Sequence, residues 1–531
     1  MSIINIGKNN NITIVILLKI EYKKNYYYIN TVVRGKLMKI LLLFLIILLS
    51  SIHNTSWSDD ISVIDLINKQ LDIIEEQDKK IRKLENLVKE LSEKIDSISE
   101  NNKSIPQNIS KKQGEKKDKK EIELADKVNE REISSPISQK IYNPEKAFFG
   151  PLLPLKSKDG NYTAGIMGLV QLDAATHNQE GNKNTGNDLS DGFIVRRAVL
   201  TLAGLSEKDF IWFLSYNYAN GGDYPKSGLG AAMVIYRGYK PWWIFAGLFG
   251  NSVGLDASNF STQRQFLEPA MPQATFAYGP GSPAIGVAAT YRGNDYYVRV
   301  GFYGEPYKNE STDDEGMGIH GRVIWQPIKE RKKAFHLGVT GYWRTVNPSD
   351  TFTNNLRDST LQFRTKGENV VGGDYILDTG IITDLEKYYH GGIEFAVIEG
   401  PLSFQSEWGI VTLDRKTQLD PSFSGGYVQG GYMLTNDSRN YNAYFAQFWR
   451  VKPNISLTEG GMGAWEIAIR ASTLNLTDAG IAGGKANSYT LGVNWYMTSF
   501  VRSIFNLTHT DAEGPVSEDF NVLGARLQLE F

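Results

Sequence analysis

Arginine is the residue whose type and spacing suggest chemistry most clearly in this sequence. In the second part of the chain it recurs on one face of segments that alternate with a period of two, and Lys is absent from this set. A guanidinium group stays charged and can bind phosphate or carboxylate through two parallel hydrogen bonds, so a wall of such groups favours anions. The arginines predicted to line a pore are Arg197, Arg299, Arg322, Arg344, Arg470, Arg502 and Arg526.

Acidic residues on the same faces support a competing explanation. They are Asp173, Glu394, Glu407, Glu466 and Glu530. Arg and Glu side chains inside a barrel can pair with one another and only stabilise the wall. The formal net charge of −2 also gives no sign that the chain as a whole binds polyanions. The sequence leaves both roles of the arginines open.

Catalytic and metal-binding patterns are missing from the sequence. The chain has no Cys, which excludes a thiol nucleophile, a disulfide scaffold and a Cys-ligated metal. Its six His are scattered, and no nucleophile stands beside His320 or His336, the two on inward faces. We therefore expect no catalytic residue, no metal and no cofactor. No P-loop, dinucleotide fingerprint or nucleic-acid motif occurs.

The arginines belong to a region, residues 148–531, in which apolar and polar residues alternate. Leu337, Val339 and Trp343, for example, oppose His336 and Arg344. Segments of about ten residues with one apolar face suit strands that cross a membrane at a tilt. The 51 Gly, the 11% aromatic residues and the mean hydropathy of −0.31 agree with this assignment. Because a membrane sheet cannot leave an edge unpaired, we predict an all-β transmembrane β-barrel of sixteen antiparallel strands, with eighteen as the alternative.

One long segment, residues 250–283, departs from the alternation. A helical turn is expected at 260–266. Barrels of this size otherwise leave an aqueous hole, so a loop folded into the interior would narrow the channel. Arg264 and Glu268 are its charged residues and are assigned to this constriction loop. The alternative is a loop that caps the outside or latches onto a neighbouring subunit.

Residues 38–58 have the charged, apolar and polar order of a secretory signal peptide. Met38 and Lys39 precede ten apolar residues at 40–49, and a small polar stretch runs to Ser58. Ten apolar residues are too few to cross a bilayer core, which needs about 20. Translation then begins at Met38, and residues 1–37 are a mis-assigned upstream extension. The alternative is a long region ahead of the apolar segment.

Residues 59–104 are predicted to form a periplasmic coiled coil, and residues 105–147 a charged flexible linker. Apolar residues in 59–104 are spaced alternately by three and four, with a phase shift near Asp78. A lone amphipathic helix lying on a domain is the alternative. The predicted seam consists of Ile64, Ile67, Leu71, Ile74, Ile81, Leu84, Val88, Leu91, Ile95 and Ile98.

Several motifs resemble the phosphate-selective porin O and P family. The most specific block is GAWEIAIR at 463–470, followed by GGK at 483–485 and LGVNWY at 491–496. Shorter matches occur in the same order at 196–198, 266–269, 426–430 and 434–435. The resemblance covers about residues 148–531. The terminal Phe531, on an alternating strand, resembles the outer-membrane assembly signal.

This resemblance implies a sixteen-stranded trimeric porin that passes anions along an arginine ladder and a Lys-lined constriction. Two positions depart from the family pattern. Asn251 stands where a Lys is common. The family often has an Arg before an Ile-Gly pair, whereas the residues before Ile285-Gly286 are Ser282-Pro283-Ala284. The expected partners are outer-membrane lipid, the outer-membrane assembly machinery, two further copies of the chain, and small anions or other hydrophilic solutes. No nucleic acid is expected.

The sequence as a whole therefore predicts an outer-membrane porin for passive diffusion of small hydrophilic solutes, with anion or phosphate selectivity set by the wall arginines. A different function is an envelope tether, in which the barrel anchors a coiled coil that reaches the periplasm or cell wall. About 40 helical residues at 1.5 Å each would reach roughly 60 Å. A barrel enzyme is the remaining alternative and lacks a recognisable nucleophile.

Overall fold

A computed structural model of the chain describes residues 2–7, 12–22, 25–33, 155–180, 189–219, 228–250, 253–278, 283–306, 316–330, 332–346, 361–372, 374–514 and 517–531. The chain divides into two compact units, residues 1–135 and 136–531. In the first, β1 (Ser2–Gly7), β2 (Ile12–Tyr22) and β3 (Asn25–Val33) form an antiparallel sheet. The predicted signal peptide, coiled coil and linker lie outside the described residues.

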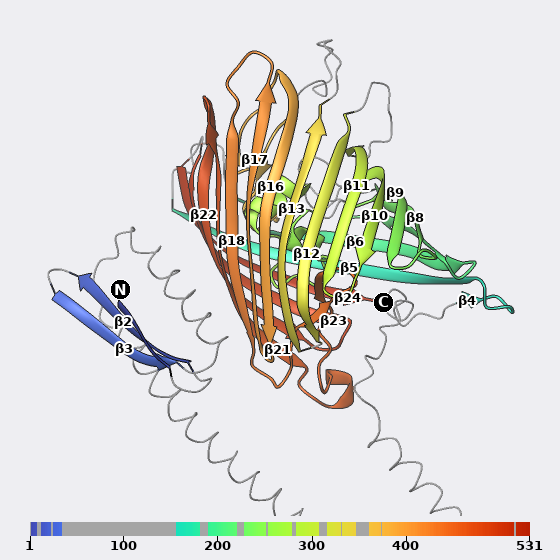
Figure 1. Cartoon of the computed structure of the whole chain (residues 1–531), viewed down its shortest axis with the longest axis horizontal. Coiled ribbons are helices and arrows are strands. Elements are labelled where there is room, and N and C mark those ends of the chain that lie inside the picture. Colours follow the sequence, from blue (N-terminus) through green and yellow to red (C-terminus); the bar gives the residue numbers. More distant parts are fainter. Residues whose placement is uncertain are drawn as a thin grey trace, which may run out of the picture. The chain divides into compact units, whose positions relative to one another are not determined.

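The second unit is a closed antiparallel barrel of sixteen long strands, as predicted (Figure 1). The last strand pairs with the first along Asp519–Glu530, which closes the sheet, and the short β4 (Leu155–Lys156) pairs with the start of the first strand. The strands are β5 (Thr163–Glu180), β6 (Gly192–Ser206), β7 (Phe210–Asn217), β8 (Gly228–Tyr236), β9 (Trp242–Phe249), β10 (Ala284–Arg292), β11 (Tyr296–Pro306), β12 (Gly318–Glu330), β13 (Lys333–Thr345), β16 (Leu385–Glu399), β17 (Leu402–Arg415), β18 (Ser422–Met433), β21 (Ala464–Asp478), β22 (Ile481–Tyr496), β23 (Val501–Glu513) and β24 (Ser517–Glu530).

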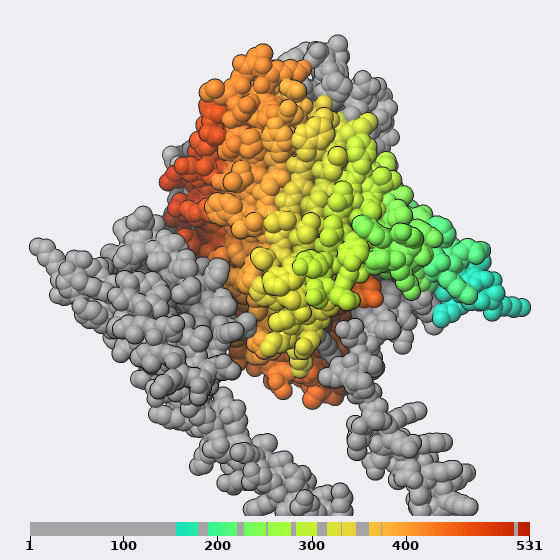
Figure 2. All heavy atoms as spheres, viewed as in Figure 1, coloured from blue at the N-terminus to red at the C-terminus, as the bar shows by residue number. Residues whose placement is uncertain are grey.

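Alternation along each strand separates an apolar outer face from a polar inner face. On β13, Val339 is 54% exposed on the outside, whereas His336 and Arg344 are buried inside. This arrangement follows from the two-residue period of a strand and suits a barrel whose outside meets lipid. The wall forms a closed surface on the face seen in Figure 2, where β12 to β18 run from yellow to orange.

The two ends of the barrel differ in their connections. At the end that holds Phe531, called the turn end here, most connections are short, such as 207–209 and 400–401, but one spans 434–463. At the opposite end, called the loop end, the longest connections are 250–283 and 346–384. These three long segments carry the structure that fills the barrel.

The elements inside these segments are short. Residues 250–283 contain α5 (Leu255–Ser258), α6 (Met271–Gln273) and the π-helical turn η3 (Ala274–Tyr278). Residues 346–384 contain the pair β14 (Arg364–Thr365) and β15 (Leu377–Asp378). Residues 434–463 contain the pair β19 (Asn440–Asn442) and β20 (Gln447–Trp449), followed by η4 (Leu457–Glu459). Within the described part of the chain, no helix has the length and apolar character needed to cross a membrane.

The helical turn predicted at 260–266 is wrong. This stretch is not helical, and α5 and α6 flank it. Side chains from elsewhere in the barrel donate hydrogen bonds to its backbone carbonyl oxygens. Arg439 donates to the carbonyl oxygen of Gln263 at 2.7 Å, and Asn494 donates to the carbonyl oxygen of Gln265 at 2.9 Å. One local bond remains, from the Gln263 N–H group to the carbonyl oxygen of Phe260 at 2.8 Å, and the surrounding chain supplies the bonds from Arg439 and Asn494.

Candidate functional site

The constriction loop, defined here as residues 253–278, is packed inside the barrel. Its residues Leu255, Phe266 and Met271 are at most 1% exposed, and α6 lies against β18 and β21. The loop connects β9 to β10 at the loop end, so its burial requires that it fold back into the interior. This placement agrees with the inward loop predicted from the sequence.

Three wall arginines hold the backbone of the constriction loop. Arg502 on β23 donates to the carbonyl oxygen of Arg264 at 2.8 Å, and Arg526 on β24 donates to that of Leu267 at 2.6 Å. Arg470 on β21 donates to the carbonyl oxygen of Glu268 at 3.1 Å and lies 4.4 Å from the Phe266 ring. Buried carbonyl groups need such donors, so these arginines fix the path of the loop.

Glu268 is the main ionic anchor of the constriction loop. Its carboxylate accepts two hydrogen bonds from Arg196, at 2.8 and 3.0 Å, and one from Arg526 at 2.8 Å. Arg526 also makes a two-pronged ion pair with Asp173 on β5, with both distances 2.7 Å. Burial by itself would raise the pKa of Glu268, but Arg196, Arg197 and Arg526 outweigh burial and lower the pKa well below its usual value. The carboxylate therefore stays charged.

Arg196 is an inward-facing residue that strict alternation misses. The pairing of β5 with β6 shifts between Gln171 and Leu172, which inserts an extra residue into β6. This β-bulge turns both Arg196 and Arg197 into the interior, where they are 2% and 6% exposed. Arg197 donates to Gln171 at 2.7 Å. The sequence signal for this bulge was the presence of two adjacent arginines in a strand that otherwise alternates.

A second long segment also contributes a carboxylate to the interior. Glu368, in the connection between β13 and β16, is bound by the Arg470 side chain, with Nε at 2.8 Å. Ser472 and Thr490 donate to the same carboxylate at 2.7 and 3.0 Å. Glu368 was not predicted as a site residue, because nothing in its local sequence indicates that its connection enters the barrel.

The third long segment enters from the turn end. Tyr441, beside the His336 ring, lies within hydrogen-bond distance of it at 2.6 Å, and Arg439 binds the constriction loop. Arg322 on β12 makes a two-pronged pair with Glu394 at 2.7 and 2.8 Å and also donates to the carbonyl oxygen of Ala446 at 2.9 Å. Segments from both ends therefore meet inside the wall.

The remaining predicted arginines lie on the inner face without a carboxylate partner. Arg299 is 3.5 Å from the Tyr303 hydroxyl, and Arg344 contacts His320 at 3.0 Å and donates to the carbonyl oxygen of Gly304 at 2.7 Å. The seven predicted arginines thus form two groups among the described residues. Arg322, Arg470 and Arg526 form ion pairs, whereas Arg197, Arg299, Arg344 and Arg502 form none.

All seven predicted arginines are at most 8% exposed. Their inward direction agrees with the sequence prediction, while their role in lining a conducting path stays a prediction. Arg264 and Glu268 both lie buried in the constriction loop. Phe531 continues the pairing of β24 and exchanges backbone hydrogen bonds with Gly168 at 2.7 and 3.0 Å. Asn251 and Ser282 lie outside the described residues.

Catalysis and metal binding receive no support from the inner face. The His336 ring also lies 3.4 Å from Glu394, in a fully buried position. Among the described residues, no three His, Asp or Glu side chains cluster in a way that could hold a metal ion.

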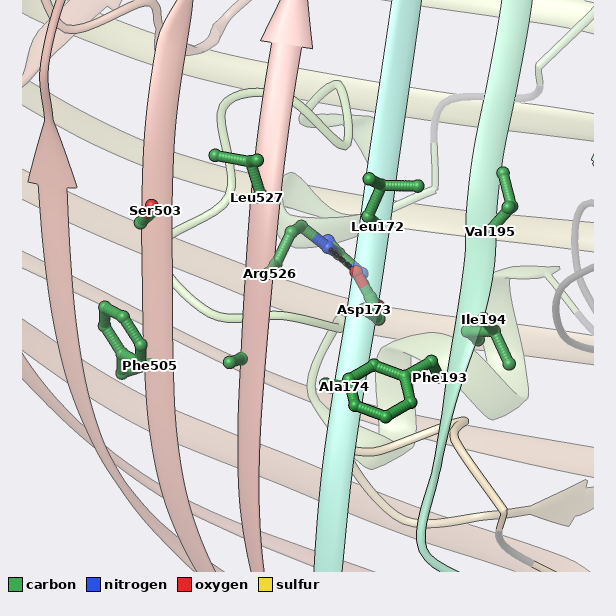
Figure 3. Close-up of a pocket in the computed structure, with 11 residues that line it drawn as sticks. Leu172, Asp173, Ala174, Phe193, Ile194, Val195, Ser503, Phe505, Arg526 and Leu527 are labelled. Atoms are coloured by element: carbon green, nitrogen blue, oxygen red, sulfur yellow. Dashed lines mark hydrogen bonds and ion pairs between the residues drawn. The ribbon is translucent and has the colours of Figure 1, made fainter.

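The outer surface carries an apolar groove of about 450 Å³ across β23, β24, β5 and β6 (Figure 3). Ala174 and Ala525 are direct cross-strand neighbours and form its floor. Phe505 pairs with Ala525 and Phe193 pairs with Ala174, so a large ring stands on each side. Phe193 is 89% exposed. The Asp173–Arg526 ion pair joins β5 and β24 beneath this floor.

Comparison with known proteins places this barrel among porins. The family model described as "Phosphate-selective porin O and P" matches residues 166–531. Porin O of Pseudomonas aeruginosa is 26% identical over 377 residues, which cover 66% of this chain and 83% of that protein. An uncharacterised protein of Caulobacter vibrioides is 27% identical over 314 residues, and that match spans only 61% of its length and 56% of this chain. Among solved structures, OmpT of Vibrio cholerae aligns with 71% of this chain and 100% of its own, with 10% identity and a TM-score of 0.44.

Proposed function

Since this chain belongs to the phosphate-selective porin O and P family and is an outer-membrane porin, we propose that small hydrophilic anions diffuse passively through its barrel and are favoured by the arginines of the inner face. The fold and the family point to a channel rather than to an enzyme. We propose that the turn end, which holds Phe531, faces the periplasm.

The observation that carries this proposal is an excess of arginines over carboxylates among the buried residues. Among the described residues, the buried set contains ten arginines, eight carboxylates and no Lys. Arg197, Arg299 and Arg344 form no ion pair with a described carboxylate. Fixed positive charge without a directly bound carboxylate lowers the electrostatic cost of an entering anion. Pairing with acids therefore accounts for only part of the inner arginines.

The phosphate preference is a narrower question than anion preference. The Arg196–Arg197 pair supports an oxyanion site, since two adjacent guanidinium groups can bind one phosphate. Glu268 opposes it, because this carboxylate already binds Arg196 and Arg526. We propose general anion preference with weak phosphate binding.

The test is the reversal potential of the purified protein in a planar bilayer under a KCl gradient, followed by titration with phosphate. Anion selectivity is the expected result, and current that phosphate blocks only at high concentration fits weak binding. Arg344→Gln combined with Arg197→Gln should move the reversal potential toward cation selectivity. Arg237→Gln, on the turn between β8 and β9, is the matched control. Cation selectivity of the unmodified protein would contradict the proposal.

We also propose that the chain assembles as a homotrimer in the outer membrane. Two neighbouring features support an interface on one side of the barrel. Strands β7 and β9 have only 8 residues each, whereas a tilted strand needs about 9–11 to cross the lipid. The groove across β23, β24, β5 and β6 adjoins this low wall. A second copy would cover the wall where lipid alone fits it poorly.

A further inference from the structure

Two buried arginines near the turn end have hydrogen-bond donors that nothing in the described chain accepts. Arg439, in the segment between β18 and β21, is 2% exposed, and Arg502, at the start of β23, is 4% exposed. Arg439 has no partner for Nε or Nη1, and Arg502 has none for Nε or Nη2. Buried N–H groups are nearly always paired, and a buried charge is costly when it is not.

The two guanidinium groups bind the carbonyl oxygens of two consecutive residues in the constriction loop. Arg439 donates to the carbonyl oxygen of Gln263 at 2.7 Å, and Arg502 donates to that of the next residue, Arg264, at 2.8 Å. Tyr496 is the cross-strand neighbour of Arg502, and its ring lies 5.7 Å from the Arg502 guanidinium carbon. The connection 434–463 between β18 and β21 is called the periplasmic segment here. It contacts the constriction loop through Arg439, and the wall contacts the same stretch of the loop through Arg502.

Two carboxylates in this region, Glu466 and Glu530, bind other partners. Glu466 accepts hydrogen bonds from Gln265 at 2.6 Å, Asn494 at 3.2 Å and Tyr496 at 2.7 Å, which are all neutral donors. Glu530 is paired with Arg450 and accepts from Gln528 at 3.1 Å. Neither carboxylate lies within ion-pair distance of Arg439 or Arg502 among the described residues.

We propose that Arg439 and Arg502 together bind one small inorganic anion, which joins the periplasmic segment to the constriction loop and the barrel wall. A water molecule could accept the free N–H groups, but it would not offset two like charges at buried positions. A single anion does both, because it accepts from both guanidinium groups and neutralises their mutual repulsion. The aromatic ring of Phe448, 4.5 Å from the Arg439 guanidinium carbon, closes one side of the site against water.

This anion is distinct from the transported solute, so the inference does not depend on the selectivity of the channel. Its place at the junction of three segments gives it a structural role. If it is removed, the periplasmic segment and the constriction loop lose a shared attachment, while the Glu268 anchor remains intact.

The direct test is a crystal of the full protein grown with bromide in place of chloride. An anomalous peak between the guanidinium groups of Arg439 and Arg502 is expected in the unmodified protein. Arg439→Gln and Arg502→Gln should each lose that peak. Arg344→Gln, another inner arginine without a carboxylate partner, should keep it and is the matched control.

A solution measurement keeps the proposal testable if either variant crystallises poorly. The melting temperature of the unmodified protein should be higher in chloride or bromide than in gluconate at equal ionic strength, since an anion that binds only the folded state stabilises it. This difference should disappear in Arg439→Gln and persist in Arg344→Gln. Absence of bromide here, while other bromide sites in the same crystal are filled, would overturn the inference. Anion-selective current in that case would leave the proposed function standing.

Discussion

At the residue scale, the role of an inner arginine depends on whether a carboxylate faces it. Arg322 and Arg344 lie one strand apart, on β12 and β13, and both are nearly inaccessible. Arg322 binds Glu394 with two hydrogen bonds, whereas Arg344 meets a histidine and a carbonyl oxygen. Arg322 neutralises the buried carboxylate of Glu394, whereas the charge of Arg344 is not neutralised by an ion pair. Substituting them should therefore have different consequences.

Arg322→Gln should reduce stability far more than Arg344→Gln. Removing Arg322 leaves the Glu394 carboxylate buried without its counter-ion, and breaking a buried pair costs about 3–5 kcal/mol. Arg344→Gln removes no carboxylate partner, so its cost should be smaller. Urea unfolding of each variant in detergent, followed by tryptophan fluorescence, measures the difference. Equal losses of stability would show that Glu394 does not depend on Arg322.

Glu268→Gln should loosen the constriction loop and increase anion selectivity. The substitution removes both ion pairs and leaves Arg196 and Arg526 with less neutralisation. Single-channel recordings should show a noisier current and a reversal potential shifted toward the anion limit. Glu386→Gln, on the exposed end of β16, is the control and should change neither quantity. A quiet current of unchanged selectivity would mean that the loop is held by its backbone contacts alone.

The same anchor predicts that the channel tolerates mild acid. The pKa of Glu268 is lowered in the folded protein, so its contribution to stability is complete above the usual pKa of a Glu side chain, near 4.5. That contribution is lost only as the pH falls through the lower folded-state pKa. Current noise should therefore be the same at pH 7 and pH 5. A marked increase in noise at pH 5 that Glu268→Gln abolishes would contradict this assignment.

At the element scale, the strands were more predictable than the segments between them. A two-residue period fixes which side chains face inward, so the inner positions of Arg299, Arg344 and Arg470 agree with the pattern. The bulge in β6 breaks that period at a single residue and thereby adds Arg196 to the interior. The contacts of Glu368 and Arg439 could not be predicted, because loops have no periodicity and these partners are far away in the sequence.

The constriction loop illustrates the same limit in detail. Its length and the width of the barrel favoured an inward position but left a cap or a latch onto a neighbouring subunit as alternatives. Its backbone conformation did not, because Arg502, Arg526 and Arg470 bind carbonyl oxygens that lie only a few residues apart. Each of these arginines comes from a different strand. The backbone conformation of the loop therefore depends on side chains of the barrel wall as well as on the sequence of the loop.

At the scale of the whole molecule, the wall is uneven in height. Strands β5, β6 and β21 to β24 have 13 to 18 residues, whereas β7 and β9 have 8. The short strands still present apolar side chains outward, including Leu214 and Ile244. A hydrophobic wall that is too short for the bilayer has to be compensated, and contact with another subunit is one way to do so. The apolar groove beside these short strands is the place where side chains of another subunit would pack.

Filling this groove should weaken assembly without unfolding the barrel. Ala525→Trp places a large ring on the floor between Phe505 and Phe193, where a neighbouring subunit would insert its side chains. We expect the variant to run as a folded monomer in native electrophoresis, because the inner face and its ion pairs are unchanged. Val339→Trp, on the opposite side of the barrel, should remain a trimer. A photoreactive benzoylphenylalanine at position 193 identifies the occupant: cross-linking in the membrane should yield a band of twice the subunit mass. Attachment of lipid alone, together with a trimeric Ala525→Trp variant, would show that the subunits meet elsewhere and that the groove is filled by acyl chains.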